Sequence, residues 1–171
     1  MKAFNNLKVG VKLIGGFMLV ALVLASLAGF NYLQLARLGA LQDAGAQRAR
    51  DAERALKTTG AAMMLYRVIA DAQLNLDFQE TQQLWAEAKQ EAVSNLAAVA
   101  AAADTEEERV QVTEASGAYD QIVRLFEDEM LPALRMAEAS TPETLQMDDE
   151  IDGLISAMQK PLQAYAASIS A

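Results

Sequence analysis

The first long pattern in the sequence is an uncharged apolar stretch near the N-terminus. Residues 13–36 contain no charged side chain, and almost all of them up to Phe30 are apolar or small. About 20 helical residues, at 1.5 Å per residue, cover a bilayer hydrocarbon core of roughly 30 Å. The pattern therefore predicts a transmembrane helix over residues 13–36, after a basic start at residues 1–12.

The basic residues around this stretch predict its orientation. Lys2, Lys8 and Lys12 precede it, and no basic residue follows before Arg37. Because basic residues are retained on the cytoplasmic side, the N-terminus is expected in the cytoplasm and residues 37–171 on the outer side of the membrane. A cleaved secretory signal is the alternative, since residues 26–28 form a small-x-small site, but the stretch exceeds the roughly 7 to 15 apolar residues of such signals.

Beyond the apolar stretch the pattern becomes amphipathic and helical. The first proline is Pro132, so one helix can continue from the membrane segment to about residue 76. Asp77, Thr105 and Thr141 have the positions of N-caps, the last of them directly before Pro142. We therefore expect four helices outside the membrane, over residues 37–76, 78–103, 105–139 and 142–171.

Short connections between long helices require antiparallel neighbours. The chain is thus expected to be all-α, an antiparallel up-down-up-down four-helix bundle preceded by a transmembrane helix that is continuous with helix 1. Helix 1 has a second apolar stripe, which predicts a homodimer through that helix. The stripe consists of Leu56, Met63, Ala70 and Leu74. The last helix ends without a cap, so we expect a longer protein.

Composition and charge narrow the chemistry. The 171 residues include no cysteine and no histidine, which removes the usual zinc and haem ligands and the common nucleophile and base pairs. All 23 acidic residues and 11 of the 14 basic ones follow residue 36, which leaves that part with a net charge of −12 and argues against a nucleic-acid partner. We expect no enzyme activity, no cofactor and no metal.

The N-terminal segment carries a resemblance to a known family. Residues 4–17, with Asn6-Leu7-Lys8-Val9-Gly10-Val11-Lys12-Leu13 at their centre, and the later Leu65-Tyr66-Arg67 are similar to features of bacterial methyl-accepting chemotaxis proteins of the four-helix-bundle sensor class. The resemblance implies the ligand-binding region of a homodimeric chemoreceptor in the bacterial inner membrane, with the bundle in the periplasm. Such a receptor detects a small molecule, signals across the membrane through helices 1 and 4, and contacts cytoplasmic signalling partners through parts outside this sequence. Alternatives are the sensor region of a histidine kinase or cyclase, or an anchored or periplasmic structural bundle that binds only proteins.

Arg67 is the first candidate for a ligand contact. It lies on the line of the apolar stripe, where its planar guanidinium suits a small carboxylate, either an amino acid or an organic acid, bound between subunits. The alternative is an ordinary helix-surface ion pair with Asp71. Tyr66, Arg135 and Gln146 have similar depths in the expected bundle and complete the candidate site. Arg135 has its own alternative, a surface pair with Glu138.

The acidic run at residues 148–152 is a second cluster to consider. Its carboxylates project around a helix and lack the alternating oxygens and turn glycine of a calcium loop, so we interpret them as a solvated face.

Overall fold

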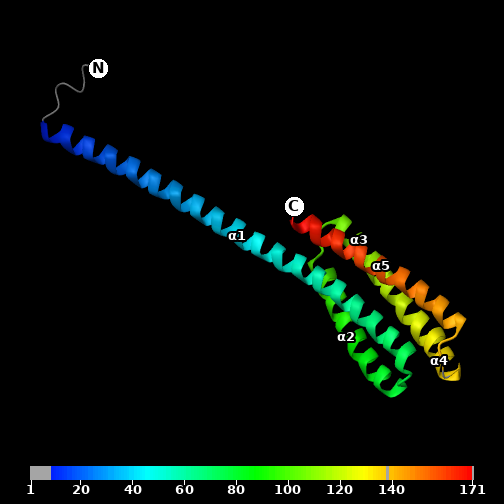
Figure 1. Cartoon of the computed structure of the whole chain (residues 1–171). Coiled ribbons are helices and arrows are strands. Elements are labelled where there is room, and N and C mark those ends of the chain that lie inside the picture. The colour runs from blue at the N-terminus through cyan, green and yellow to red at the C-terminus, as the bar shows by residue number, and fades with distance from the viewer. Residues whose placement is uncertain (1–8, 138, 171) are drawn as a thin grey trace. The chain divides into compact units, whose positions relative to one another are not determined.

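The computed structural model describes residues 9–137 and 139–170, and nearly all of them are helical. Its segments are α1 (Val9–Asn75), α2 (Phe78–Ala102), α3 (Glu106–Arg124), the π-helix η1 (Leu125–Met130), α4 (Leu131–Ala137) and α5 (Pro142–Ser170), as Figure 1 labels them apart from η1. Because α3, η1 and α4 follow without a break, the chain has four long helical stretches, and no strand occurs among the described residues. The all-α prediction is confirmed. Most of the basic start, residues 1–8, lies outside the described part.

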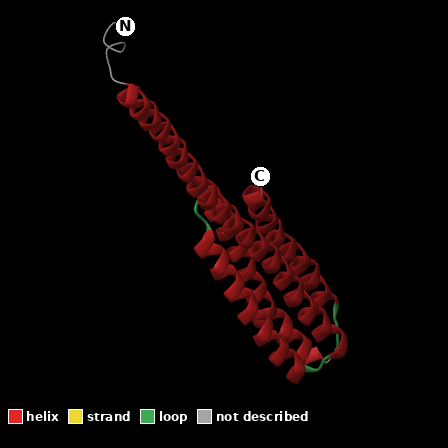
Figure 2. Cartoon of the chain, turned by 90° about the vertical axis from the view of Figure 1, so that its left-hand side faces the viewer, coloured by secondary structure: helices red, strands yellow, loops and turns green. Residues whose placement is uncertain are grey.

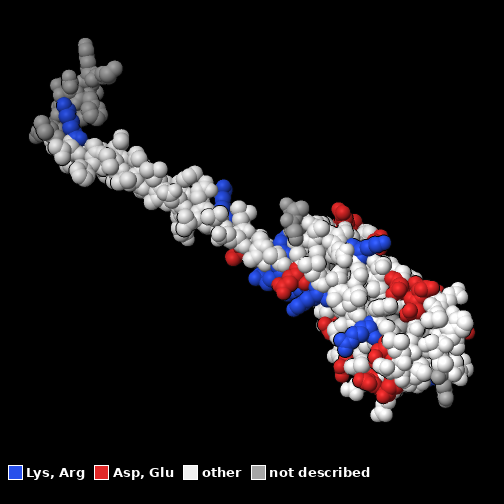
Figure 3. Space-filling model, viewed as in Figure 1, with Lys and Arg blue, Asp and Glu red and all other residues white. Residues whose placement is uncertain are grey.

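The chain divides into two compact units, residues 1–46 and 47–171. In the first unit, the side chains described along residues 10–46 are almost all exposed, including Phe17 at 75% and Leu24 at 61%. The helix is apolar and long enough to cross a membrane, and its most apolar window has no residue buried in the structure. Figure 3 shows a long white stretch of this helix between two groups of basic atoms, whereas patches of acidic and basic residues are spread over the second unit.

The second unit has one hydrophobic core to which all four helical stretches contribute. Figures 1 and 2 show the later part of α1 beside α2, and α3 beside α5. The largest fully buried side chains come from all four helical stretches, most of them from α1, α3 with its π-helical continuation, and α5, and they include Leu65, Ile69, Ile122, Phe126, Met158 and Tyr165. They recur at helical spacing, so each helical stretch of the second unit buries one face in the core.

Local sequence explains where the helices begin. The Asp77 carboxylate accepts hydrogen bonds from the backbone N–H groups of Gln79 and Glu80 at the start of α2. Thr105 and Glu108 form a reciprocal capping box at the start of α3, and the Thr141 hydroxyl accepts from the Thr144 N–H group beside Pro142. The three predicted N-caps are therefore confirmed.

Two backbone features were not predicted. Leu76 has a φ of 55°, the left-handed conformation that ends α1 and that usually falls to glycine or asparagine. Its half-buried side chain packs against the core, which explains why an apolar residue occupies the position. The second feature is η1, one turn in which Phe126 and Met130 are fully buried. The wider turn lets residues on either side of it keep facing the core.

Candidate functional site

The four candidate residues from the sequence lie on different sides of the second unit. Arg67 is exposed on α1, where it borders a groove toward α2. Tyr66, one residue earlier, is half-buried and interacts with the carboxylates of Asp148 and Asp152 on α5. Adjacent residues on a helix point about 100° apart, so the two side chains serve different neighbours within one subunit.

Arg135 and Gln146 line neither the groove beside Arg67 nor the surroundings of Tyr66. The Arg135 guanidinium lies 5.5 Å from the centre of the Phe78 ring, a cation–π contact between α4 and the start of α2. Its alternative partner, Glu138, lies outside the described residues. Gln146 is on the exposed side of α5. The four predicted site residues therefore do not converge on one pocket within a single subunit.

Arg67 borders a groove between two helices of the second unit. The groove has a volume of about 160 Å³, and its walls come from two helices. Its lining consists of Met64, Arg67, Val68 and Asp71 from α1, and Glu80, Leu84 and Glu87 from α2. Val68 is buried and Leu84 is half-buried, whereas Arg67, Glu80 and Glu87 are exposed, so the groove has an apolar floor and a charged rim.

The ion pair between Arg67 and Asp71, the alternative drawn from the sequence, is not formed in the structure. The Asp71 carboxylate instead accepts a hydrogen bond of 2.6 Å from the Asn75 side chain. Among the described residues, Arg67 makes no hydrogen bond or ion pair. The guanidinium is therefore available to an external group.

A polar cluster between α1 and α5 surrounds Tyr66. The negative charges of Asp152 and Asp148, followed by burial, raise the pKa of the Tyr66 hydroxyl. Burial raises the pKa of Asp148, and the nearby charges of Asp152 and Asp149 add to the shift, while a hydrogen bond with Gln73 opposes it. One Asp148 oxygen is buried without a hydrogen-bond partner. The acidic run interpreted as fully solvated thus has one member turned partly inward.

A network of side-chain contacts at η1 was not predicted from the sequence. The Trp85 indole N–H group donates to Glu127 at 2.7 Å, Lys89 pairs with the same carboxylate, and the Trp85 ring lies 4.5 Å from that of Phe126. Burial acts to raise the pKa of Glu127, but the hydrogen bonds from Lys89 and Trp85 and the Lys89 charge outweigh it and lower the pKa. Trp85 and Lys89 share a face at a spacing of four residues, but a π-turn has no sequence signature that would have pointed to Glu127.

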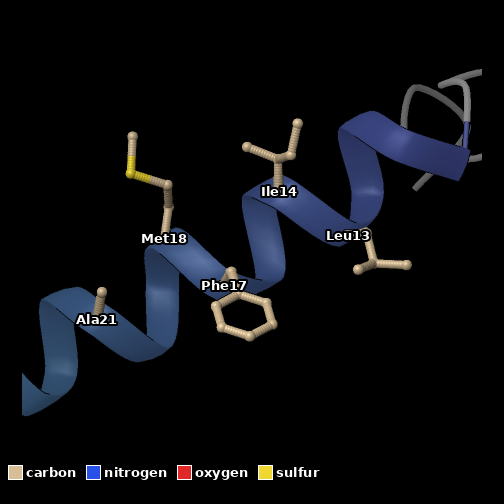
Figure 4. A pocket seen from close by; sticks show the side chains of 5 residues that line it. All are labelled: Leu13, Ile14, Phe17, Met18 and Ala21. Atoms are coloured by element: carbon tan, nitrogen blue, oxygen red, sulfur yellow. The ribbon is translucent and has the colours of Figure 1, made fainter.

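A hollow on the first unit is formed by one helix alone. It is lined by Leu13, Ile14, Phe17, Met18 and Ala21, all from α1. Figure 4 shows these side chains projecting from opposite sides of a single helix, without a second element to enclose them. The hollow is a piece of apolar helix surface, of the kind that a lipid chain or another helix covers.

Comparison with known proteins adds no identity. No protein-family model matches the sequence, and neither the curated proteins nor the solved structures give a match. Within the described residues, no group of three or more histidine, cysteine, aspartate and glutamate side chains is arranged to hold a metal ion. The side chains around Arg67 and Tyr66 can bind charged groups. One face of α1 offers the unpaired Arg67 guanidinium, and carboxylates lie beside both faces.

Proposed function

We propose that the chain is the sensor region of a bacterial transmembrane chemoreceptor of the methyl-accepting type. In this proposal residues 13–36 cross the inner membrane with the N-terminus in the cytoplasm, and residues 37–171 form a periplasmic ligand-binding domain. The apolar surface of the first unit, whose most apolar window has no buried residue, and the absence of charge between Lys12 and Arg37 support the membrane segment. The amino-terminal residues that resemble this family support the choice of receptor.

The proposed domain is an antiparallel up-down-up-down bundle. Contacts between α1 and the later helix support this arrangement: the Gln159 amide donates to the Thr59 carbonyl, and the Ser140 hydroxyl donates to the Gln73 carbonyl. As the residue number rises along α1 the partner's number falls, as antiparallel neighbours require. In such a bundle α1 and α5 carry a signal between the ligand and the membrane, because α2 and α3 turn back.

A single observation carries the ligand-binding part of the proposal, namely the exposed Arg67 guanidinium without a protein partner. A small carboxylate matches its fork in a bidentate way. The net charge of −12 beyond residue 36 repels anions at long range, so binding depends on this local cation. We expect an affinity in the micromolar range, about −8 kcal/mol.

The proposed receptor is a homodimer through α1. Leu56, Met63 and Leu74 are 54%, 49% and 81% exposed, and they follow the heptad positions of a helix–helix seam together with Ala70. In membranes, single cysteines that replace Leu56, Met63 or Ala70 are expected to crosslink far better than cysteines that replace Arg124 or Asp128. Equal crosslinking at all five positions would refute the seam.

Calorimetric titration of the full chain in lipid nanodiscs with a panel of amino acids and organic acids tests the function. Loss of a charge-assisted contact costs roughly 1.5 to 3 kcal/mol, so Arg67→Ala should weaken a hit about ten- to a hundredfold. Arg124→Ala, which removes another exposed cation, is the matched control. If Arg67→Ala binds the hit as tightly as the parent, the site is wrong. If nothing on the panel binds, a bundle with only protein partners becomes the better interpretation.

A further inference from the structure

The groove between α1 and α2 has a charge pattern that selects among carboxylate ligands. Three carboxylates line it, those of Asp71, Glu80 and Glu87, against the single guanidinium of Arg67, so its net charge is −2. Asp71 is engaged by Asn75. Neither Glu80 nor Glu87 has a side-chain hydrogen bond or ion pair within the described part of the chain. One cation and two anions are thus left without partners around one hollow.

A plain organic acid fits this pattern poorly. Its carboxylate would pair with Arg67, but it would bring further negative charge beside three carboxylates, and like charges at close range repel. A molecule that carries both a carboxylate and an ammonium group pairs with both kinds of partner. Ionised carboxylate and ammonium groups form short, strong hydrogen bonds with side chains of the opposite charge.

The dimensions of the groove set the size of such a molecule. The groove has a volume of about 160 Å³ and is open along its charged rim. Glu80 and Glu87 are two helical turns apart, roughly 10 Å along α2 at 1.5 Å per residue. The apolar floor of Val68 and Leu84 lies between these charges. An extended side chain can rest on that floor while its ends meet opposite parts of the rim.

We infer that the groove binds a free amino acid within one subunit and prefers a basic one. The α-carboxylate pairs with Arg67, the α-ammonium group with one of the two free glutamates, and a side-chain cation with the other. This inference rests on the proposed role of Arg67 in binding a carboxylate. The guanidinium alone would accept an amino acid or an organic acid, whereas the two glutamates favour the amino acid. A basic amino acid also brings the net positive charge that the groove lacks.

The test uses the full chain in nanodiscs and calorimetric titration with L-lysine, L-alanine and succinate. We expect L-lysine to bind most tightly, L-alanine at least tenfold more weakly, and succinate not measurably. Measurable succinate binding that matches or exceeds that of L-lysine overturns the preference for an amine, while it leaves the proposed carboxylate sensor standing. Failure of all three compounds to bind overturns this inference and counts against the proposed function as well.

Neutral variants of the two glutamates test the inference by the direction in which the affinity for L-lysine changes. Glu80→Gln and Glu87→Gln should each weaken L-lysine binding about tenfold, because each removes a partner of an ammonium group. In a site that recognises the carboxylate alone, the same changes reduce repulsion and tighten binding. Glu91→Gln, an exposed neighbour on α2 outside the groove, is the control and should leave the affinity unchanged. All three side chains are exposed, so the variants are expected to fold. Tighter binding by either groove variant overturns the inference.

Discussion

Two regions of the single helix α1 are both rich in apolar residues and have opposite surroundings. Leu24, in the first unit, is 61% exposed, and its neighbours are apolar on every side of the helix. Leu65, in the second unit, is fully buried, and its neighbours alternate between a buried face and an exposed one. The comparison shows that the distribution of apolar residues around a helix decides whether it buries one face against the core or presents an apolar surface on every side.

The largest expected effect comes from placing charge in the first region. The double change Val20→Arg and Leu24→Arg should abolish membrane insertion, since each arginine at the bilayer centre costs about 2.5 to 3.5 kcal/mol on insertion scales. The measurement is the fraction of the chain that resists alkaline extraction from membranes.

The double change Leu38→Arg and Leu41→Arg is the control for insertion. Both leucines are exposed on the same helix but follow residue 36, so the inserted fraction should stay the same. Equal loss in both variants would show that the membrane segment does not end near residue 36.

A matched pair of truncations sharpens the comparison. Leu65→Ala should lower the free energy of unfolding of the second unit by about 2 to 5 kcal/mol, the range for a fully buried leucine. Leu24→Ala should leave it unchanged. Urea unfolding in detergent, followed by the fluorescence of Trp85, measures both, because Trp85 is 4% exposed and becomes solvated when the core opens. A comparable loss in Leu24→Ala would mean that the first unit packs against protein.

Charge is tolerated within the second unit where it has partners. Glu108 is 3% exposed, and its carboxylate accepts hydrogen bonds from the Asp104 and Thr105 N–H groups at 2.9 and 3.1 Å and pairs with Arg48. Burial acts to raise the pKa of Glu108, but these partners outweigh it and lower the pKa below the ordinary value of 4.5. Glu108→Gln should therefore cost about 1 to 3 kcal/mol at neutral pH.

The pH dependence of that loss follows from the sign of the shift. A lowered pKa in the folded state gives stability that is present above the unfolded pKa and is lost as the pH falls through the folded one. The parent and Glu108→Gln should thus become more alike in unfolding free energy below pH 4.5. Glu107→Gln, at an exposed neighbour, should behave like the parent throughout. A difference that persists unchanged in acid would exclude the ionised carboxylate as its source.

The fold was more predictable than the candidate site, for physical reasons. Helix starts depend on a few adjacent residues, so Asp77, Thr105 and Thr141 could be recognised from the sequence alone. The groove depends on which residues of α2 lie opposite Arg67, and that is set by the rotation and axial position of two helices. The same limit hid Glu127, because its contacts with Trp85 and Lys89 depend on the π-turn.

The smallest expected effect concerns Asp148, a half-buried carboxylate whose hydrogen bonding is incomplete. Burial and the charges of Asp152 and Asp149 raise the pKa of Asp148, one oxygen of which has no hydrogen-bond partner. With a raised folded pKa, protonation contributes stability below the unfolded pKa, and that contribution is lost as the pH rises through the folded value, so the ionised group opposes folding at pH 7.

Asp148→Asn should raise the unfolding free energy at pH 7 by less than about 1 kcal/mol, because solvent screens this half-buried site. The gain should fade as the pH falls through the raised pKa of the folded state and should be lost below the ordinary value of 3.8, whereas exposed Asp120→Asn should show no gain. A less stable Asp148→Asn at pH 7 would mean that the ionised carboxylate has a partner among the groups that face it from α1, Gln73 or the Tyr66 hydroxyl, strong enough to outweigh its burial.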